Sequence, residues 1–214
     1  MSQRDTVHAL LDRAGTTYAA EAGIKLDDKP APLFQLLMLS ELLSARISAD
    51  IAISATAELV HSGFRTARNV ADADWQELVD ALGRGHYRRY DERTASQLGE
   101  IAGTTLDKYD GDLRKLAAVA DHDVDRAGEL LQQFTGIGPT GSDIFLREVQ
   151  DVWPWVRPHF DQRAVRGAER VDLPADPGKL AGLTPESHAA ELAAALVRVG
   201  LDDELAEEVR SATH

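Results

Sequence analysis

Residues 134–141 read FTGIGPTG, and this stretch decides how the 214-residue chain folds. The residues before it, 123–134, carry apolar side chains at helical spacing and predict an amphipathic helix. Gly136 and Gly138 are residue types that adopt the unusual backbone dihedrals of a tight turn. Pro139 suits the first turn of a following helix, where its missing N–H is not needed. The stretch therefore predicts a helix, a short turn and a second helix.

The same residues also match two nucleotide-binding patterns. Gly136 to Gly141 fit GxGxxG, and Asp161 follows twenty residues later, where a dinucleotide-binding fold would place its ribose-binding acid. With Ser142 the stretch comes close to a phosphate-binding P-loop, but the lysine of that motif is absent. Both patterns require a strand before the first glycine, and residues 127–134 (AGELLQQF) favour a helix instead.

A helix-turn-helix corner of this kind can bind a phosphate without basic side chains. The turn aims backbone N–H groups and a helix N-terminus outward, and both attract anions. We therefore expect DNA contacts at the hairpin residues, which are Gly136, Ile137, Gly138, Thr140, Gly141 and Ser142. The alternative is a plain helical corner with no ligand.

The remaining sequence predicts helices and no strands. Residues 33–43 (LFQLLMLSELL) are apolar on nearly all sides, which indicates a buried central helix. No alternating strand pattern is visible. Further helices are expected at 50–60, 74–82, 91–106, 113–119, 142–149, 162–168 and from Thr184 onward, with a break at Gly200. Residues 29–32 (KPAP) and the stretch 171–182, with its prolines and glycines, are expected to be connectors.

Composition excludes several classes of protein. The chain has no cysteine, so it can form neither disulfides, thiolate zinc sites nor cysteine-ligated iron–sulfur clusters. Its seven histidines show no metal-ligand spacing, and we expect no metal. No apolar run is long enough for a membrane span, and the N-terminus does not resemble a signal peptide. We expect a cytoplasmic protein.

The net charge of −13 taken alone argues against a nucleic-acid partner. The charge is unevenly distributed, however. Residues 184–214 are strongly acidic, whereas residues 84–93 carry four arginines against two acidic residues. An acidic face can therefore lie away from a DNA-binding face.

Three segments together resemble the endonuclease III-like DNA glycosylases of the helix-hairpin-helix superfamily. Residues 134–141 resemble the LPGVGxxT hairpin of that family. Residues 155–161 (WVRPHFD) resemble the segment that ends in its catalytic aspartate, and residues 34–45 (FQLLMLSELLSA) resemble the buried helix that ends in its LLSAQ motif. The resemblance spans about residues 32–171.

The resemblance implies an all-α fold of two helical lobes. Residues 33–150 would form a six-helix barrel that includes the helix-hairpin-helix at 123–150, and residues 1–32 and 151–214 would form the second lobe. It implies a monomeric, nucleoid-associated enzyme of DNA base-excision repair that binds double-stranded DNA and flips a damaged or mismatched base. Asp161 would be the catalytic carboxylate.

The chain departs from the family pattern at three points. The cysteine cluster is missing, so the resemblance implies no iron–sulfur cluster; the hairpin remains compatible with a monovalent cation. Thr140 stands where lyase members carry a lysine, and no lysine occurs between Lys115 and Lys179, which implies a monofunctional glycosylase. Arg46 replaces the glutamine after LLSA, which fills the gap left by the flipped base.

Breaking an N-glycosidic bond places positive charge on the sugar, which a nearby carboxylate stabilises. Asp161 suits this role at the start of a helix expected at 162–168, although an aspartate there can also be a simple N-cap. Tyr87, Trp155 and His159 are candidates for the base pocket, with core packing as the alternative. Arg88 and Arg89 are candidate phosphate contacts or part of a solvated face.

Two other functions remain open. The fold could be retained as a catalytically inactive helix-hairpin-helix protein that binds DNA or damage, or as a scaffold for a protein partner. The sequence does not identify the excised base, because pocket shape decides it.

Overall fold

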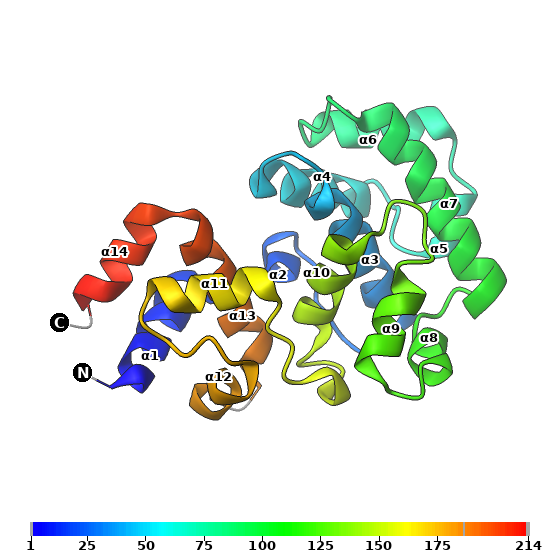
Figure 1. Cartoon of the computed structure of the whole chain (residues 1–214). Coiled ribbons are helices and arrows are strands. Elements are labelled where there is room, and N and C mark those ends of the chain that lie inside the picture. Colours follow the sequence, from blue (N-terminus) through cyan, green and yellow to red (C-terminus); the bar gives the residue numbers. More distant parts are fainter. Residues whose placement is uncertain (1, 186, 213–214) are drawn as a thin grey trace. The chain divides into compact units, whose positions relative to one another are not determined.

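The computed structural model describes residues 2–185 and 187–212, and within these residues all regular structure is helical (Figure 1). This confirms the expected all-α fold class. The chain divides into two compact units. Unit 1 comprises Met1–Tyr18 and Leu146–His214, and unit 2 comprises Ala19–Phe145. The lobe boundaries at residues 32/33 and 150/151 stay predictions of the sequence.

Unit 2 is built around the buried helix α3, which packs against α4. Helix α6 packs against α4 and α7, and α5 packs against α7. The side chains from Leu33 to Leu39 are at most 9% exposed, because the residues of this helix are apolar on nearly every side. The helices of unit 2 are α3 (Pro30–Ser44), α4 (Ala49–His61), α5 (Ala67–Ala71), α6 (Trp75–Arg84), α7 (Asp91–Tyr109), α8 (Arg114–Val119) and α9 (Val124–Leu131).

Two further helices cross the boundary between the units: α2 (Tyr18–Glu21) and α10 (Pro139–Val149).

Several helices of unit 2 begin at a side-chain cap. Ser48, Thr66, Asp74 and Asp123 each accept a hydrogen bond from a first-turn backbone N–H. The sequence therefore marks the starts of these helices as well as their buried faces.

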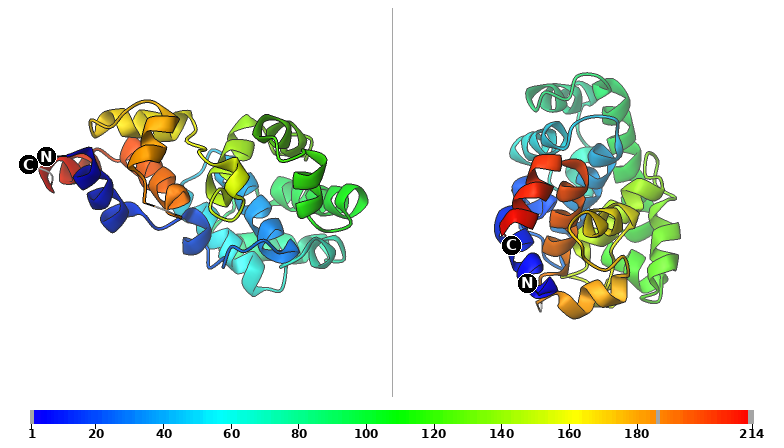
Figure 2. Two further views of the ribbon diagram at one scale, coloured as in Figure 1. Left: turned by 90° about the horizontal axis from the view of Figure 1, so that it is seen from below. Right: turned by 60° about the vertical axis from the view of Figure 1, so that its left-hand side comes forward.

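Unit 1 is organised around α13, which packs against α1, α11 and α14. Its helices are α1 (Gln3–Ala14), the short 3-10 helix η1 (Pro154–Val156), α11 (Gln162–Arg170), α12 (Pro177–Leu183), α13 (Ala189–Leu201) and α14 (Asp203–Ala212), which Figure 2 shows from two further directions. The crossing of α11 and α13 is close: a Cβ atom at Gly167 would clash with the backbone carbonyl of Leu196. Only glycine fits there.

The expected connectors at 29–32 and 171–182 were only partly correct, because residues 30–32 and 177–182 are helical whereas residues 171–176 are not. Pro30 is the first residue of α3, a position where proline's fixed φ and missing N–H cost nothing. In the second stretch, Asp176 caps a short helix, α12, by accepting a hydrogen bond of 2.8 Å from the backbone N–H of Lys179. Proline there starts a helix rather than preventing one.

The last expected helix begins later in the sequence than predicted. Thr184 is the C-cap of α12, and α13 begins at Ala189. Residue 186, within the range expected to be helical, lies outside the described residues. Helix α13 continues through Gly200 to Leu201, so the expected break was also wrong. Within the described part of the chain, no helix is long and apolar enough to cross a membrane.

Candidate functional sites

The hairpin joins α9 to α10 through a turn that contains one left-handed residue. Gly136 has a φ of +84°, a conformation that L side chains rarely adopt, so glycine is required. Gly138 does not have a positive φ, and the expectation that it supplies an unusual dihedral was wrong. The hydroxyl of Ser142 donates to the carbonyl of Gly128 at 3.3 Å, which ties the second helix to the first.

The outer part of the hairpin can present backbone donors. Pro139 begins α10, so the N–H groups of Thr140 and Gly141 have no carbonyl within the helix to bond. The N–H of Ile137, by contrast, donates to the carbonyl of Phe134 at 3.1 Å, and its side chain is 3% exposed. Phosphate binding at this turn stays a prediction, and of its two possible donors Thr140 is partly exposed whereas Gly141 is buried.

Asp161 occupies the N-cap of α11 and is buried, at 8% exposure. Its Oδ1 accepts a hydrogen bond of 2.9 Å from the backbone N–H of Ala164, and its Oδ2 accepts one of 2.5 Å from Nη1 of Arg147. The N-terminus of α11 and the guanidinium of Arg147 thus each supply one donor to the carboxylate. Asp161 is therefore held in one orientation from both of its oxygens.

The partner of Asp161 is itself enclosed. The side chain of Arg147, on α10, is only 2% exposed. Its guanidinium lies over the ring of Tyr18, 5.9 Å from the centroid, and the guanidinium of Arg198 lies over the same ring at 4.4 Å. Arg198 also donates to the carbonyl of Ala14 at 2.7 Å. These contacts fix Arg147, and through it Asp161, within unit 1.

The segment that leads into Asp161 is clamped by Gln150. Its Nε2 donates to the carbonyl of His159 at 3.0 Å, and its Oε1 accepts from the N–H of His159 at 2.9 Å. Trp155 stacks on the buried Trp153 with ring centroids 5.3 Å apart. His159 and Trp155 are both partly exposed and both belong to unit 1, together with Asp161. Their assignment to a base pocket stays a prediction.

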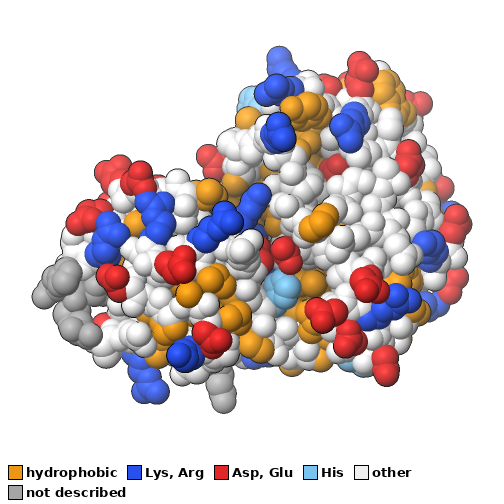
Figure 3. All heavy atoms as spheres, in the orientation of Figure 1, with side chains coloured by type: hydrophobic (Ala, Val, Ile, Leu, Met, Phe, Trp, Pro, Cys, Tyr) orange, Lys and Arg blue, Asp and Glu red, His pale blue; other side chains and the backbone are white. Residues whose placement is uncertain are grey.

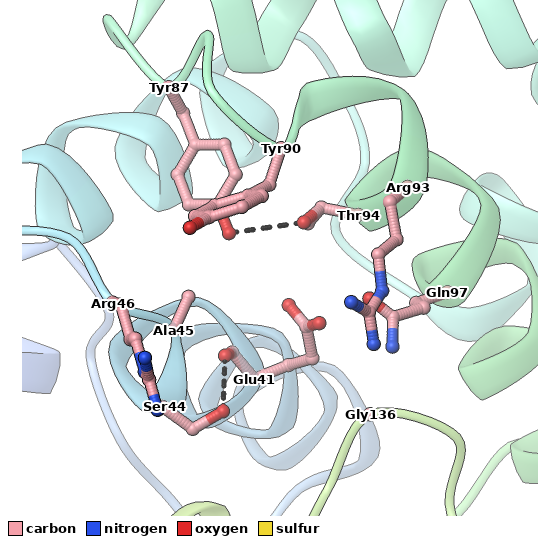
Figure 4. A pocket seen from close by; sticks show the side chains of 10 residues that line it. All are labelled: Glu41, Ser44, Ala45, Arg46, Tyr87, Tyr90, Arg93, Thr94, Gln97 and Gly136. Atoms are coloured by element: carbon pink, nitrogen blue, oxygen red, sulfur yellow. Dashed lines mark hydrogen bonds between the residues drawn. The ribbon is translucent and has the colours of Figure 1, made fainter.

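Unit 2 contains a cavity of about 410 Å³, within the range of small-molecule sites (Figure 4). Its lining comes from three parts of the chain that are far apart in sequence. These are the end of α3, the segment from residue 87 into α7, and the hairpin turn. Its lining residues are Glu41, Ser44, Ala45, Arg46, Tyr87, Tyr90, Arg93, Thr94, Gln97 and Gly136. Arg46, Tyr87 and Gly136, three of the expected site residues, are thus brought together.

Tyr87 is more deeply placed than a base-stacking residue would need to be. Its side chain is 1% exposed, and its hydroxyl shares a 3.1 Å hydrogen bond with the hydroxyl of Thr94. Burial raises the pKa of Tyr87 above its usual value. The neighbouring Tyr90 is partly exposed and lies against the guanidinium of Arg89, 5.3 Å from the ring centroid. Tyr90 therefore offers the more accessible ring in the cavity.

Glu41 is the residue of this cavity that sequence reasoning missed. Its side chain is 5% exposed, and its Oε2 is buried without a hydrogen-bond partner. Burial raises the pKa of Glu41 from 4.5 to about 8, and the nearby charge of Arg93 only partly opposes this. The signal in the sequence was a single acidic residue within the apolar run 33–43.

The expected phosphate contacts, Arg88 and Arg89, do not line this cavity. Arg88 is exposed and lines a second, more open hollow with Val79, Asp80 and Asp91. Arg89 is exposed beside Tyr90. Acidic and basic side chains are interspersed over the face drawn in Figure 3. Among residues 2–185 and 187–212, no group of three His, Asp or Glu side chains could hold a metal ion.

Comparison with known proteins identifies the fold of this chain. No family model and no curated protein matches the sequence. A solved structure of a non-covalent endonuclease III–DNA complex aligns with 92% of this chain and 85% of its own, with a TM-score of 0.51 and 15% identity. A trapped endonuclease III–DNA covalent intermediate, in an estranged-adenine complex, aligns over the same shares with a TM-score of 0.49 and 16% identity. The similarity to the non-covalent complex shows that this chain has the all-helical fold of endonuclease III.

Proposed function

We propose that the protein is a monofunctional DNA glycosylase that hydrolyses the N-glycosidic bond of a flipped damaged or mismatched base. The observation that carries the proposal is the buried carboxylate of Asp161, fixed at the N-terminus of α11 by Ala164 and Arg147. The endonuclease III fold supports it, because the solved structure with a TM-score of 0.51 to this chain is a DNA complex. Double-stranded DNA is the proposed partner and a nucleoid-associated monomer the proposed form.

The chemistry requires a fixed negative charge beside the sugar. As the bond from C1′ to the base breaks, its electron pair leaves with the base and positive charge develops on the sugar ring. The carboxylate of Asp161 stabilises that charge, a water molecule adds its oxygen to C1′, and the proton that the water loses passes through solvent to the departing base. A carboxylate has about four acceptor sites, and the described contacts of Asp161 use two of them. The others are free to orient the water.

The proposed absence of lyase chemistry rests on the hairpin sequence. A Schiff base needs a lysine amine, and the hairpin carries Thr140 in that place. Hydrolysis should therefore leave an intact strand with an abasic site. The lack of cysteine means that the proposed enzyme works without an iron–sulfur cluster.

DNA binding is proposed to combine three elements. The N–H groups of Thr140 and Gly141 would bind a phosphate, Arg88 and Arg89 would add charge, and Arg46 would occupy the gap left by the flipped base. Because the protein carries a net charge of −13, its affinity should rest on few phosphate contacts and fall only moderately with salt.

One observation favours a second candidate, a damage-binding protein without turnover. The ion pair between Arg147 and Asp161 gives the aspartate a structural role that would preserve it even in an inactive protein. Incubation with a panel of single-lesion duplexes separates the two. Strand breaks that appear only after alkali, with no product trapped by borohydride, support the monofunctional enzyme. Breaks without alkali contradict it, and binding without breaks supports the second candidate.

A further inference from the structure

The two oxygens of the Asp161 carboxylate are held by contacts of different kinds. Oδ1 accepts the hydrogen bond of the helix cap, 2.9 Å from the backbone N–H of Ala164. A cap needs only one oxygen, and the torsion that turns the carboxylate plane is broad for aspartate. The other oxygen, Oδ2, accepts a hydrogen bond of 2.5 Å from Nη1 of Arg147. Arg147 is therefore the described contact that sets the plane of the carboxylate.

The backbone of Arg147 is joined to the segment before Asp161 as well. Nε2 of Gln150 donates to the carbonyls of Arg147 and of His159, both at 3.0 Å. Oε1 of Gln150 accepts a hydrogen bond from the N–H of His159 at 2.9 Å. Gln150 is fully buried, so water does not compete for these bonds. The last turn of α10 and the segment that leads into Asp161 thus form one hydrogen-bonded piece.

The guanidinium of Arg147 is not arranged for stability alone. An arginine side chain has five N–H donors, and in the described part of the chain Nε of Arg147 is buried without a hydrogen-bond partner. A buried donor left unpaired is destabilising, and a buried ion pair can often be replaced by apolar residues without loss of stability. The orientation of the proposed catalytic carboxylate gives this pair a purpose that stability does not.

Tyr18 supplies the aromatic face on which this guanidinium lies. The guanidinium carbon of Arg147 is 5.9 Å from the ring centroid, and that of Arg198 is 4.4 Å from it. A cation at such a distance is attracted by the ring quadrupole. The ring is buried, which limits screening of this attraction by water. The last residue of the N-terminal part of unit 1 therefore takes part in placing Arg147.

We propose that Arg147 is a positioning residue for base excision, which turns the Asp161 carboxylate toward the breaking bond, and that Tyr18 supports it. The proposal rests on the proposed glycosylase function and adds two residues that act through Asp161. Positive charge develops at one place on the sugar, and a small misplacement of a catalytic group can cost about 10² in rate. Arg147 and Tyr18 therefore affect the rate of excision and not the affinity for DNA.

A comparison of rate with affinity tests the role of Arg147. Arg147→Lys keeps the positive charge but loses the planar guanidinium, so the contact to Oδ2 is no longer held in a fixed plane. On a lesion duplex that the wild type processes, we expect a single-turnover rate lowered by about tenfold or more and a dissociation constant within about twofold of the wild type. An unchanged rate, or a loss of affinity equal to the loss of rate, would overturn the proposal.

Arg170→Lys is the matched control. Arg170 lies on α11 as Asp161's own helix, pairs with Asp203 and donates to the carbonyl of Gly200 at 3.0 Å, but has no described contact with Asp161. The same substitution at this half-exposed ion pair should leave the excision rate within about twofold of the wild type. Equal losses of rate in the two lysine variants would show that the packing of α11 matters rather than the orientation of the carboxylate.

The ring of Tyr18 gives a second test that leaves both charges in place and does not depend on the folding of Arg147→Lys. Tyr18→Phe retains the aromatic face and should excise at a rate within about twofold of the wild type. Tyr18→Leu removes that face and should excise about threefold more slowly or less, with unchanged affinity for the duplex. Melting temperatures confirm that both variants are folded. Equal rates in the two variants would remove Tyr18 from the positioning role.

A double variant separates positioning from a general loss of stability. If Arg147 acts only through Asp161, Arg147→Lys should slow the wild type but not the residual reaction of Asp161→Asn. Losses by the same factor in both backgrounds would overturn the proposal. The outcome is separable from that of the glycosylase test. A wild type that excises no base from any duplex would remove both proposals, whereas an active wild type with a fully active Arg147→Lys variant would remove only the positioning role.

Discussion

Arg147 and Asp161 form an ion pair with 2.5 Å between Nη1 and Oδ2, and their side chains are 2% and 4% exposed. The pair connects α10 to the start of α11 inside unit 1. It means that the proposed catalytic carboxylate is also part of the packing. A substitution of Asp161 therefore changes both the stability of the fold and the proposed catalysis, and these two effects must be measured separately.

The first prediction concerns this separation. Asp161→Asn preserves the helix cap, because asparagine is also a good N-cap residue, but it leaves the guanidinium of Arg147 buried and uncompensated. We expect a loss of about 3–5 kcal/mol in the free energy of unfolding. The double variant Arg147→Met/Asp161→Asn should recover most of it. Urea unfolding measures the free energy of unfolding of the single and the double variant. If Asp161→Asn were as stable as the wild type, the ion pair would contribute little to stability.

The second prediction concerns the hairpin. Gly136→Ala places a side chain at a φ of +84° and against Gln97, and should destabilise the protein by about 1–3 kcal/mol. Gly138→Ala is the matched control, since its φ is not left-handed and its Cβ would meet open space. Thermal melting of the two variants compares them directly. Equal melting temperatures would mean that the turn relaxes at no cost.

The third prediction is a pH dependence of stability that belongs to Glu41. Its pKa is raised in the folded protein to about 8, so the folded state keeps a proton that the unfolded state loses above its ordinary pKa of 4.5. The stabilisation is complete below pH 4.5 and is lost as the pH rises to about 8, with a slope of about 1.4 kcal/mol per unit.

Unfolding of the wild type and of Glu41→Gln between pH 5.5 and pH 8 checks this prediction. The difference between the two isolates Glu41, because every other titrating group is shared. We expect the stability of Glu41→Gln relative to the wild type to rise across this window. Parallel curves for the two proteins would show that the pKa of Glu41 is ordinary.

The fourth prediction concerns the packing of unit 1. Gly167→Ala would force its Cβ into the carbonyl of Leu196, and the crossing of α11 and α13 would have to open. We expect a cost of about 3 kcal/mol. Gly182→Ala, within α12, meets no atom within 4 Å and should gain up to about 1 kcal/mol from helix propensity. Similar stabilities for the two variants would contradict the close crossing.

The sequence was sufficient to predict the fold class and the helix-hairpin-helix. Helical periodicity identified α3, α4, α6, α7 and α9, because each buries one face or the whole of its surface. The glycines and Pro139 located the turn. Proline misled in two places, at Pro30 and Pro177, because it is excluded from helix interiors but favoured in the first turn.

The candidate sites were predicted less completely. Asp161 was predicted from the resemblance of residues 155–161 to a known catalytic segment and from its position before a helix. Its partner Arg147 lies fourteen residues away on another helix, and no local pattern connects them. Glu41 was read as part of a buried apolar helix. Its place in the cavity wall depends on the residues around its carboxyl. These residues come from α7 and the hairpin, and only the tertiary structure brings them to α3.

The most direct test of the central claim is the single-turnover excision rate of the double variant Arg147→Met/Asp161→Asn on whichever lesion duplex the wild type processes. The variant removes the carboxylate without leaving a buried charge, and its melting temperature confirms that it is folded. The account predicts alkali-dependent breaks by the wild type and a rate lowered by about 10² or more in the variant. A folded variant that excises the base at the wild-type rate would show that Asp161 is a structural residue and that the catalytic group lies elsewhere.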